Sequence, residues 1–212
     1  MAWDNDWKNK ETVIDRYNLK SQDFRAKLFK PLLQRLTRVR VRAPHLTNGR
    51  IALGIAAWLL FSRAPITATL IFVFALITDL VDGPLARFQN HASDRGKFFD
   101  LLADHIVYIL ILLTILSLGY ESFLISYNIA IVSLTYLLAT IKKNETSPTD
   151  WLIKPYPKVS YLEVIIIVPF MLRMFFQIDL IASALIFDNF LATLLSIFYF
   201  VAIQMKNKPP MP

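Results

Sequence analysis

The sequence predicts an all-α membrane protein with six transmembrane helices, preceded by a cytoplasmic amphipathic juxtamembrane helix. Hydrophobic residues make up 55% of the 212 residues, and the mean hydropathy is +0.45. Six apolar stretches of membrane-spanning length follow one another along the chain, and the basic residues cluster between alternate stretches. A water-soluble domain of this size rarely contains so much apolar material.

The first 42 residues are predicted to form two parts. Residues 1–20 are polar and mixed in charge, without the apolar region of a signal peptide, and read as a solvated arm. In residues 21–42, Phe24, Leu28 and Leu32 recur at helical spacing, with Lys and Arg on the other face. A basic amphipathic helix beside membrane spans is typical of a helix on the anionic cytoplasmic leaflet. The alternative is a solvated helix that packs on its own protein.

Six apolar segments follow and predict a single transmembrane domain at residues 43–205. A membrane helix needs about 20 mostly apolar residues, within a range of roughly 17–25, and each segment falls in this range. The connections after the first, third and fifth segments are very short, so they leave no room for extramembrane domains on that side. The segments are 46–62, 65–86, 97–118, 122–141, 159–177 and 180–203.

The basic residues indicate the orientation in the membrane. Twelve of the 23 Lys and Arg lie before residue 51, and nine more follow the second, fourth and sixth segments. Only Arg63 and Arg173 lie toward the other side. This positive-inside pattern places both termini in the cytoplasm, at the cell membrane if the source is prokaryotic. The net charge of +7 is therefore read as a topology signal, and nucleic acid is not expected as a partner.

Four aspartates flank the connection between the second and third segments. Asp79 and Asp82 are three residues apart, and Asp100 and Asp104 are four apart, so each pair shares one face of its helix. A helical hairpin can bring both pairs to one depth, where converging carboxylates need cations. Oxygen ligands favour Mg²⁺ or Mn²⁺, and a carboxylate-bound metal pair suits phosphoryl transfer. The alternative is that these acids only cap helix ends.

Three residues after the second aspartate support a phosphate site. Gly83 allows a substrate to approach the backbone closely, and Arg87 is placed to bind a phosphate with two hydrogen bonds. Pro84 removes a backbone donor and is expected to loosen or end the helix there.

The absence of cysteine excludes thiolate metal ligands, and three histidines make a His-rich zinc site improbable.

The stretch between residues 79 and 104 resembles the signature of the CDP-alcohol phosphatidyltransferases. All eight fixed positions are present in Asp79-x₂-Asp82-Gly83-x₂-Ala86-Arg87-x₈-Gly96-x₃-Asp100-x₃-Asp104. The resemblance implies transfer of a phosphatidyl group from CDP-diacylglycerol, or a similar CDP-lipid, to an alcohol, with release of CMP. It also implies two divalent ions, a homodimer, and contact with membrane lipids.

The resemblance also implies a role for each signature residue. The expected metal ligands are Asp79, Asp82, Asp100 and Asp104, and Asp104 is also expected to take the proton from the acceptor hydroxyl. The expected CDP-binding residues are Asp79, Gly83, Ala86 and Arg87. Gly96 is expected to permit close approach of the third helix.

The acceptor alcohol is less well defined by the sequence. The segments PHLTNGR (44–50) and TDLVDG (78–83) resemble the phosphatidylglycerophosphate synthase branch, which implies glycerol 3-phosphate. His45 stands where that branch usually has Asn. Inositol phosphate, serine and phosphatidylglycerol stay open as acceptors. Candidates to bind the acceptor phosphate are Arg50, Lys154 and Lys158, although each is equally consistent with a topology determinant or with contact to lipid headgroups.

Two titratable residues near the predicted site, His105 and Glu163, are expected to play supporting parts. His105 is expected to pack or to donate a hydrogen bond behind the site. Glu163 is expected mainly as a charge at a helix N-terminus, with acceptor binding as the alternative. A cation transporter would place polar residues at several depths in several spans. A structural membrane protein with an inactive site is the third alternative.

Overall fold

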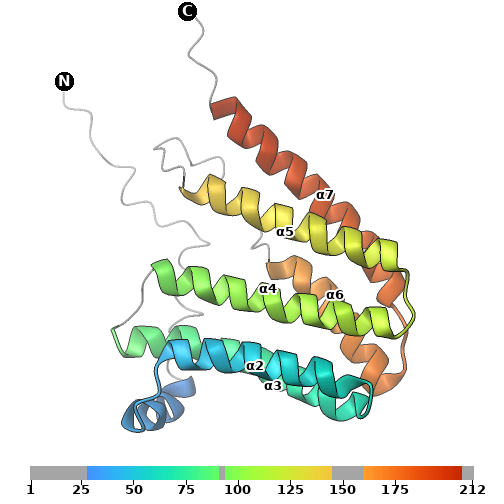
Figure 1. Cartoon of the computed structure of the whole chain (residues 1–212). Helices are drawn as coiled ribbons and strands as arrows, with labels where there is room; N and C mark the ends of the chain where they lie inside the picture. Colours follow the sequence, from blue (N-terminus) through green and yellow to red (C-terminus); the bar gives the residue numbers. More distant parts are fainter. Residues whose placement is uncertain (1–27, 91–93, 145–159, 207–212) are drawn as a thin grey trace, which may run out of the picture.

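The computed structural model describes residues 28–90, 94–144 and 160–206, and within these ranges the chain is helical (Figure 1). Each of the six predicted apolar segments is a helix, with ends that differ from the prediction by at most three residues. The helices are α2 (Ala43–Phe61), α3 (Pro65–Phe88), α4 (Asp94–Ser117), α5 (Ser122–Asn144), α6 (Ser160–Phe176) and α7 (Ile181–Lys206).

Four of the described helices, namely α3, α4, α5 and α7, are long and apolar enough to cross a membrane. α2 begins with the polar stretch APHLTNGR, so its hydrophobic part is shorter than a full span. The described part of α6 has 17 residues. The structure therefore supports a multi-pass membrane protein, with four spans evident from length and composition.

The helix that precedes α2 is described at residues 28–38 and ends in a turn at 39–40. Its Leu33 is buried against Val81 and Leu85 of α3, so the side of the helix that carries Leu33 packs on the protein itself. Leu28 and Leu32 on the same helix are exposed. The polar arm predicted at 1–20 and the beginning of the predicted amphipathic helix lie outside the described residues.

Consecutive helices run antiparallel, as Figure 1 shows for α2 and α3 at the bottom of the view, whereas α5 and α7 at the top run in the same direction. α4 packs on α2, and Gly54 lies at that contact. A β-carbon at this position would come within 3.2 Å of the side chains of Val107 and Leu110. The small residue therefore lets the two helix backbones approach closely, as is common in membrane helix packing.

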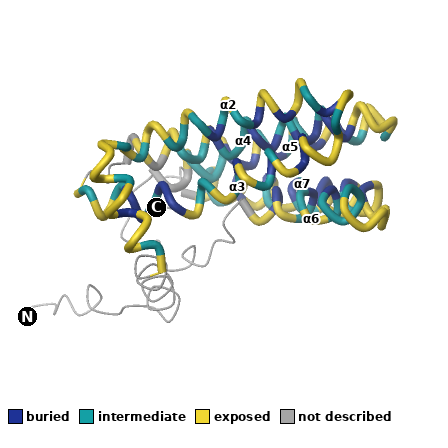
Figure 2. Tube along the Cα trace, turned by 90° about the horizontal axis from the view of Figure 1, so that it is seen from below, coloured by how far each residue is buried: buried dark blue, intermediate teal, exposed yellow. Residues whose placement is uncertain are grey.

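Buried side chains form one main hydrophobic core along the inward faces of the helices, with exposed residues on the outside (Figure 2). Phe170 of α6 packs against Phe61 of α2 and Phe72 of α3, with ring centroids 6.3 Å apart in both pairs. These contacts join α6 to the hairpin of α2 and α3. They fix the positions of the three helices that carry or support the site.

The expectation that Pro84 ends the helix is wrong. α3 continues through Pro84 to Phe88, and the Gln89 backbone nitrogen still donates to the Leu85 carbonyl at 2.9 Å. Proline removes only its own backbone donor, and the surrounding helical hydrogen bonds and the burial of Pro84 hold the helix together. As a result α3 continues past Asp79 and Asp82, with Arg87 in its last turn and Gln89 directly after its end.

Candidate active site

The four signature aspartates meet between α3 and α4. One carboxylate oxygen from each of Asp79, Asp82 and Asp100 lies within 4.8 Å of the other two, a spacing that could hold a metal ion. Asp82 is buried and the Asp79, Asp100 and Asp104 side chains are partly exposed. The two helical pairs thus converge as the sequence spacing predicted, in a site that is open on one side.

Arg50 of α2 joins all four aspartates. Its side chain is fully buried, and its guanidinium pairs with Asp79 and lies 2.6 Å from carboxylate oxygens of both Asp100 and Asp104. It also donates to the Asp100 main-chain carbonyl at 3.0 Å, while Asp82 is farther away at 3.9 Å. Arg50 can reach the tetrad because α2 packs against both α3 and α4.

The donor set fits a hard divalent cation. Within the cluster itself, the guanidinium of Arg50 supplies one positive charge against four negative charges when all four carboxylates are ionised. Both carboxylate oxygens of Asp82 are buried and accept no hydrogen bond from the described residues. Buried, unpaired carboxylate oxygens are costly unless a cation binds them, and Mg²⁺ and Mn²⁺ prefer oxygen ligands.

A cavity of about 530 Å³ adjoins the tetrad and includes Asp82 and Asp100 in its wall. Of the four expected CDP-binding residues, Gly83, Ala86 and Arg87 line this cavity. The fourth, Asp79, belongs to the tetrad and is not part of the cavity wall. A β-carbon on Gly83 would lie 3.8 Å from a guanidinium nitrogen of Arg87, so the arginine folds over this glycine. Residues of two helices line the cavity on either side: Pro44, Thr47 and Asn48 of α2, and Gly83, Ala86 and Arg87 of α3.

Sequence reasoning did not assign a binding role to the α2 part of this wall. Within the segment PHLTNGR only Arg50 was given a binding role, although Thr47 and Asn48 supply polar groups to the cavity. The signal was present as a polar stretch at the start of an otherwise apolar helix. The other two acceptor candidates, Lys154 and Lys158, lie outside the described residues.

A hydrogen-bonded group lies behind Asp104, and it includes Glu163, which lies in the first turn of α6 as expected. Glu163 is buried with 6% of its surface exposed, and the Tyr136 hydroxyl donates to it at 2.8 Å. His105 lies 3.5 Å from the same carboxylate and 2.7 Å from the Ser133 hydroxyl. His105 therefore has the supporting position that was expected, and it links α4 to α5 and α6.

A second buried polar network was missed by sequence reasoning. The Tyr108 hydroxyl donates to the Asn128 side-chain oxygen at 2.6 Å, and the Asn128 amide donates to Asp188 and to Asn189, at 2.8 Å each. One carboxylate oxygen of Asp188 has no hydrogen-bond partner among the described residues. The signal was an aspartate and two asparagines within apolar spans, and such residues usually face the bundle interior.

Comparison with known proteins agrees with this geometry. The sequence profile of the CDP-alcohol phosphatidyltransferase domain matches residues 41–201. A CDP-diacylglycerol–glycerol-3-phosphate 3-phosphatidyltransferase from Pectobacterium atrosepticum is 33% identical over 119 residues, which is 50% of this chain and 65% of that protein.

Proteins with the same name in Yersinia pestis and Salmonella choleraesuis are 32% identical over 105 residues and 31% over 108 residues. These matches cover 46% and 47% of this chain, and 57% and 59% of the relatives. The chain thus spans less than two thirds of the length of the curated relatives it matches. Because the family profile covers most of the chain, including the tetrad and the adjoining cavity, the protein belongs to the CDP-alcohol phosphatidyltransferase family.

Proposed function

We propose that this protein transfers a phosphatidyl group from CDP-diacylglycerol, or a similar CDP-lipid, to glycerol 3-phosphate and releases CMP in phospholipid biosynthesis. The observation that carries the proposal is the aspartate tetrad around Arg50, opening into a 530 Å³ cavity that shares Asp82 and Asp100. The names of the bacterial relatives support the choice of glycerol 3-phosphate as acceptor.

The cavity wall suits a nucleotide diphosphate. Gly83 and Ala86 present little side-chain volume, so the nucleotide can lie close to the α3 backbone, and Arg87 provides a fork of donors for a phosphate. Two Mg²⁺ or Mn²⁺ ions held by the four aspartates would neutralise diphosphate charge and favour departure of CMP. Arg50 holds the carboxylates in one cluster by pairing with Asp79, Asp100 and Asp104.

Asp104 is proposed as the catalytic base. The acceptor hydroxyl oxygen forms a bond to the phosphatidyl phosphorus, the bond from that phosphorus to the CMP oxygen breaks, and the hydroxyl proton passes to the Asp104 carboxylate. The Asp104 side chain is 22% exposed, so it can face a substrate in the open side of the site.

The acceptor phosphate requires cationic groups near the tetrad. Arg50, Lys154 and Lys158 stay the proposed groups, and Arg50 is the one whose described position is at the site. Inositol phosphate, serine and phosphatidylglycerol are the alternative acceptors within the same chemistry. A homodimer is also proposed, on the resemblance to the family alone.

The proposal is tested by release of CMP from radiolabelled CDP-diacylglycerol by the purified protein, across these four acceptors, with Mg²⁺ or with EDTA. We expect glycerol 3-phosphate to support release only with metal. Asp104→Asn should lower the rate by about 10²–10⁴-fold, the usual range for loss of a general base. Asp179→Asn, which alters an exposed aspartate between α6 and α7, is the matched control and should retain activity. Absence of CMP release with every acceptor would reject the proposed transfer.

We further propose six spans, with the helix before α2 at the cytoplasmic surface and both termini and the site facing the cytoplasm. The basic loops and the location of the tetrad at the end of α3 support this orientation. The chain has no cysteine, so single cysteines can report sidedness without a modified background. In sealed vesicles, an impermeant thiol reagent should reach Asn90→Cys only from the cytoplasmic side and Ser62→Cys only from the opposite side. Labelling of both from one side would reject the topology.

Cation transport is the second candidate function, because the network of Tyr108, Asn128 and Asp188 places polar groups at a second depth in the bundle. Such residues can mark an ion path. Most of their polar atoms are paired with one another, which favours a structural role. Cation flux in proteoliposomes without any CMP release would reverse this ranking.

A further inference from the structure

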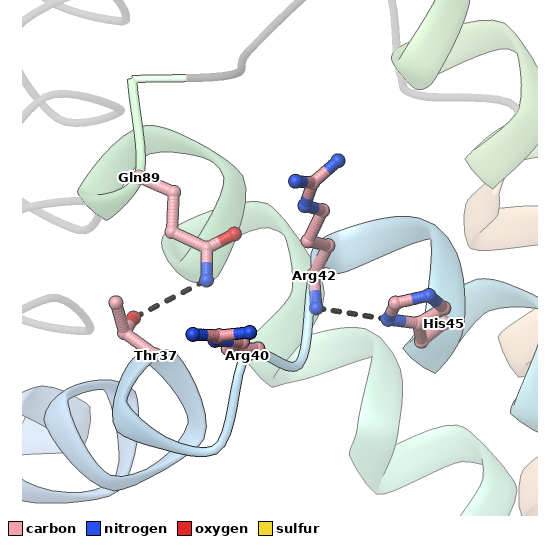
Figure 3. A pocket seen from close by; sticks show the side chains of 5 residues that line it. All are labelled: Thr37, Arg40, Arg42, His45 and Gln89. Atoms are coloured by element: carbon pink, nitrogen blue, oxygen red, sulfur yellow. Dashed lines mark hydrogen bonds between the residues drawn. The ribbon is translucent and has the colours of Figure 1, made fainter.

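A second hollow, of about 630 Å³, lies where the helix at 28–38 turns into α2 (Figure 3). We call it the elbow pocket, and it is lined by Thr37, Arg40, Arg42, His45 and Gln89. Arg42 and Gln89 also line the 530 Å³ cavity, so the two spaces are neighbours. None of the roles proposed above uses Thr37, Arg40 or His45.

The lining of the elbow pocket is rich in hydrogen-bond donors and contains no acid. Arg40 and Arg42 are exposed, and neither pairs with a carboxylate within the described residues. The Arg42 backbone nitrogen donates to Nδ1 of His45 at 3.1 Å, as Figure 3 shows, so a neutral His45 ring carries its proton on Nε2. Two guanidinium groups, this ring nitrogen and the Thr37 hydroxyl suit an anion with several acceptor oxygens.

The backbone of Arg40 gives a second indication. Its φ is +60°, in the left-handed region that favours glycine or asparagine. Arg40 closes the helix by donating to the Thr37 carbonyl at 3.0 Å, and Val41 donates to Leu36 at 2.9 Å. An arginine is held where glycine would be less strained, and such strain points to a functional constraint. Because these backbone donors are already used, recognition of an anion must come from the side chains.

The location suits a ligand at the membrane surface. The helix at 28–38 exposes Leu28 and Leu32, and Val39 beyond it is also exposed. An exposed apolar face next to arginines is typical of a segment that rests at the headgroup level of a bilayer. The elbow pocket therefore lies between this segment and the end of α3, where phosphates of lipids and of water-soluble metabolites are both available.

We propose that the elbow pocket binds a phosphate group, carried either by an anionic phospholipid headgroup or by a soluble phosphomonoester. Guanidinium groups bind phosphate oxygens with paired, charge-assisted hydrogen bonds, which lysine-type point charges do not provide. The bound phosphate lies beside the cavity proposed for the nucleotide, because Arg42 and Gln89 are common to both walls. The proposal concerns binding and holds whether or not the proposed transfer reaction takes place.

The test uses the full chain purified in neutral detergent. The pocket variant is Arg40→Gly with Arg42→Gln, in which glycine keeps the left-handed helix end. The matched control is Arg35→Gln with Arg38→Gln, which removes two exposed charges from the helix at 28–38, outside the pocket. Thermal unfolding checks that both proteins are folded. Native mass spectrometry then measures retained phosphatidylglycerol against phosphatidylcholine, and calorimetry measures binding of inorganic phosphate and glycerol 3-phosphate.

We expect the pocket variant to bind the phosphate probe at least about tenfold more weakly than the wild type, since each lost charged hydrogen bond is worth roughly that factor. The control should bind as the wild type does. Loss confined to phosphatidylglycerol identifies a lipid headgroup, and loss confined to inorganic phosphate or glycerol 3-phosphate identifies a soluble ligand. Equal binding by the pocket variant and the wild type, or an equal loss in the control, would overturn the proposal.

Discussion

The position of Arg50 leads to a prediction about stability in the absence of metal. In Arg50→Ala, four carboxylates keep their positions on α3 and α4 but lose their only buried counter-charge among the described residues. The metal-free protein should therefore be much less stable than the wild type. Divalent cations should restore part of the difference, because they supply the positive charge that the arginine no longer provides.

The magnitude follows from the contacts. The guanidinium contacts three carboxylates, and the separations to Asp100 and Asp104 are both 2.6 Å. Charge-assisted hydrogen bonds are each worth about 1.5–3 kcal/mol, and desolvation of the buried guanidinium offsets part of their sum. Removing one member of a buried ion pair usually costs about 3–5 kcal/mol, and we expect this loss in EDTA. Mg²⁺ stabilises both proteins, but it should bind the variant more tightly because the competing positive charge of Arg50 is gone, and each tenfold gain in affinity narrows the gap by about 1.4 kcal/mol.

The assay is unfolding in mixed micelles with EDTA or with Mg²⁺, followed by circular dichroism. Arg63→Ala, which alters an exposed arginine in the connection before α3, is the control and should change stability little in either condition. Equal stability of Arg50→Ala and the wild type in EDTA, or a gap that Mg²⁺ leaves unchanged, would refute the reasoning.

Three further predictions concern packing, the second polar network and the nucleotide wall. Gly54→Ala should be at least about 1 kcal/mol less stable than Gly49→Ala, because only the first β-carbon meets side chains at 3.2 Å; thermal unfolding of the two variants compares them. Asp188→Asn should be as stable as the wild type, since its amide oxygen can keep the hydrogen bonds, whereas Asp188→Ala should lose about 1–3 kcal/mol in the same assay; equal losses would argue against the network. Arg87→Lys should weaken CDP binding about tenfold in calorimetry through loss of the paired hydrogen bonds, and unchanged affinity would remove Arg87 from the site.

The helical segments and the tetrad could be predicted from sequence because both depend on local spacing. Long apolar runs define the helices, and separations of three and four residues place Asp79 with Asp82 and Asp100 with Asp104 on common faces. The prediction that the helix could end at Pro84 was wrong. The loss of one backbone donor is outweighed by the hydrogen bonds of the neighbouring residues and by the burial of Pro84.

The role of Arg50 depends on contacts between distant parts of the chain and could not be read from local pattern. Arg50 pairs with Asp79, which is 29 positions away, and with Asp100, which is 50 positions away. Both contacts require α2 to pack on α3 and on α4. The burial of Glu163 and Asp188 depends in the same way on partners in other helices, so it could not be predicted from local pattern. Gly54, which permits the close packing of α2 on α4, was likewise not singled out from the sequence.

Calorimetric titration of Mn²⁺ into the purified protein, with and without CDP, tests most directly whether the aspartate cluster is a metal site beside a diphosphate. The wild type should bind the metal more tightly in the presence of CDP, and Asp82→Asn should lose most of this binding while remaining folded. Identical Mn²⁺ binding by the wild type and Asp82→Asn, or no binding by the wild type, would contradict the account.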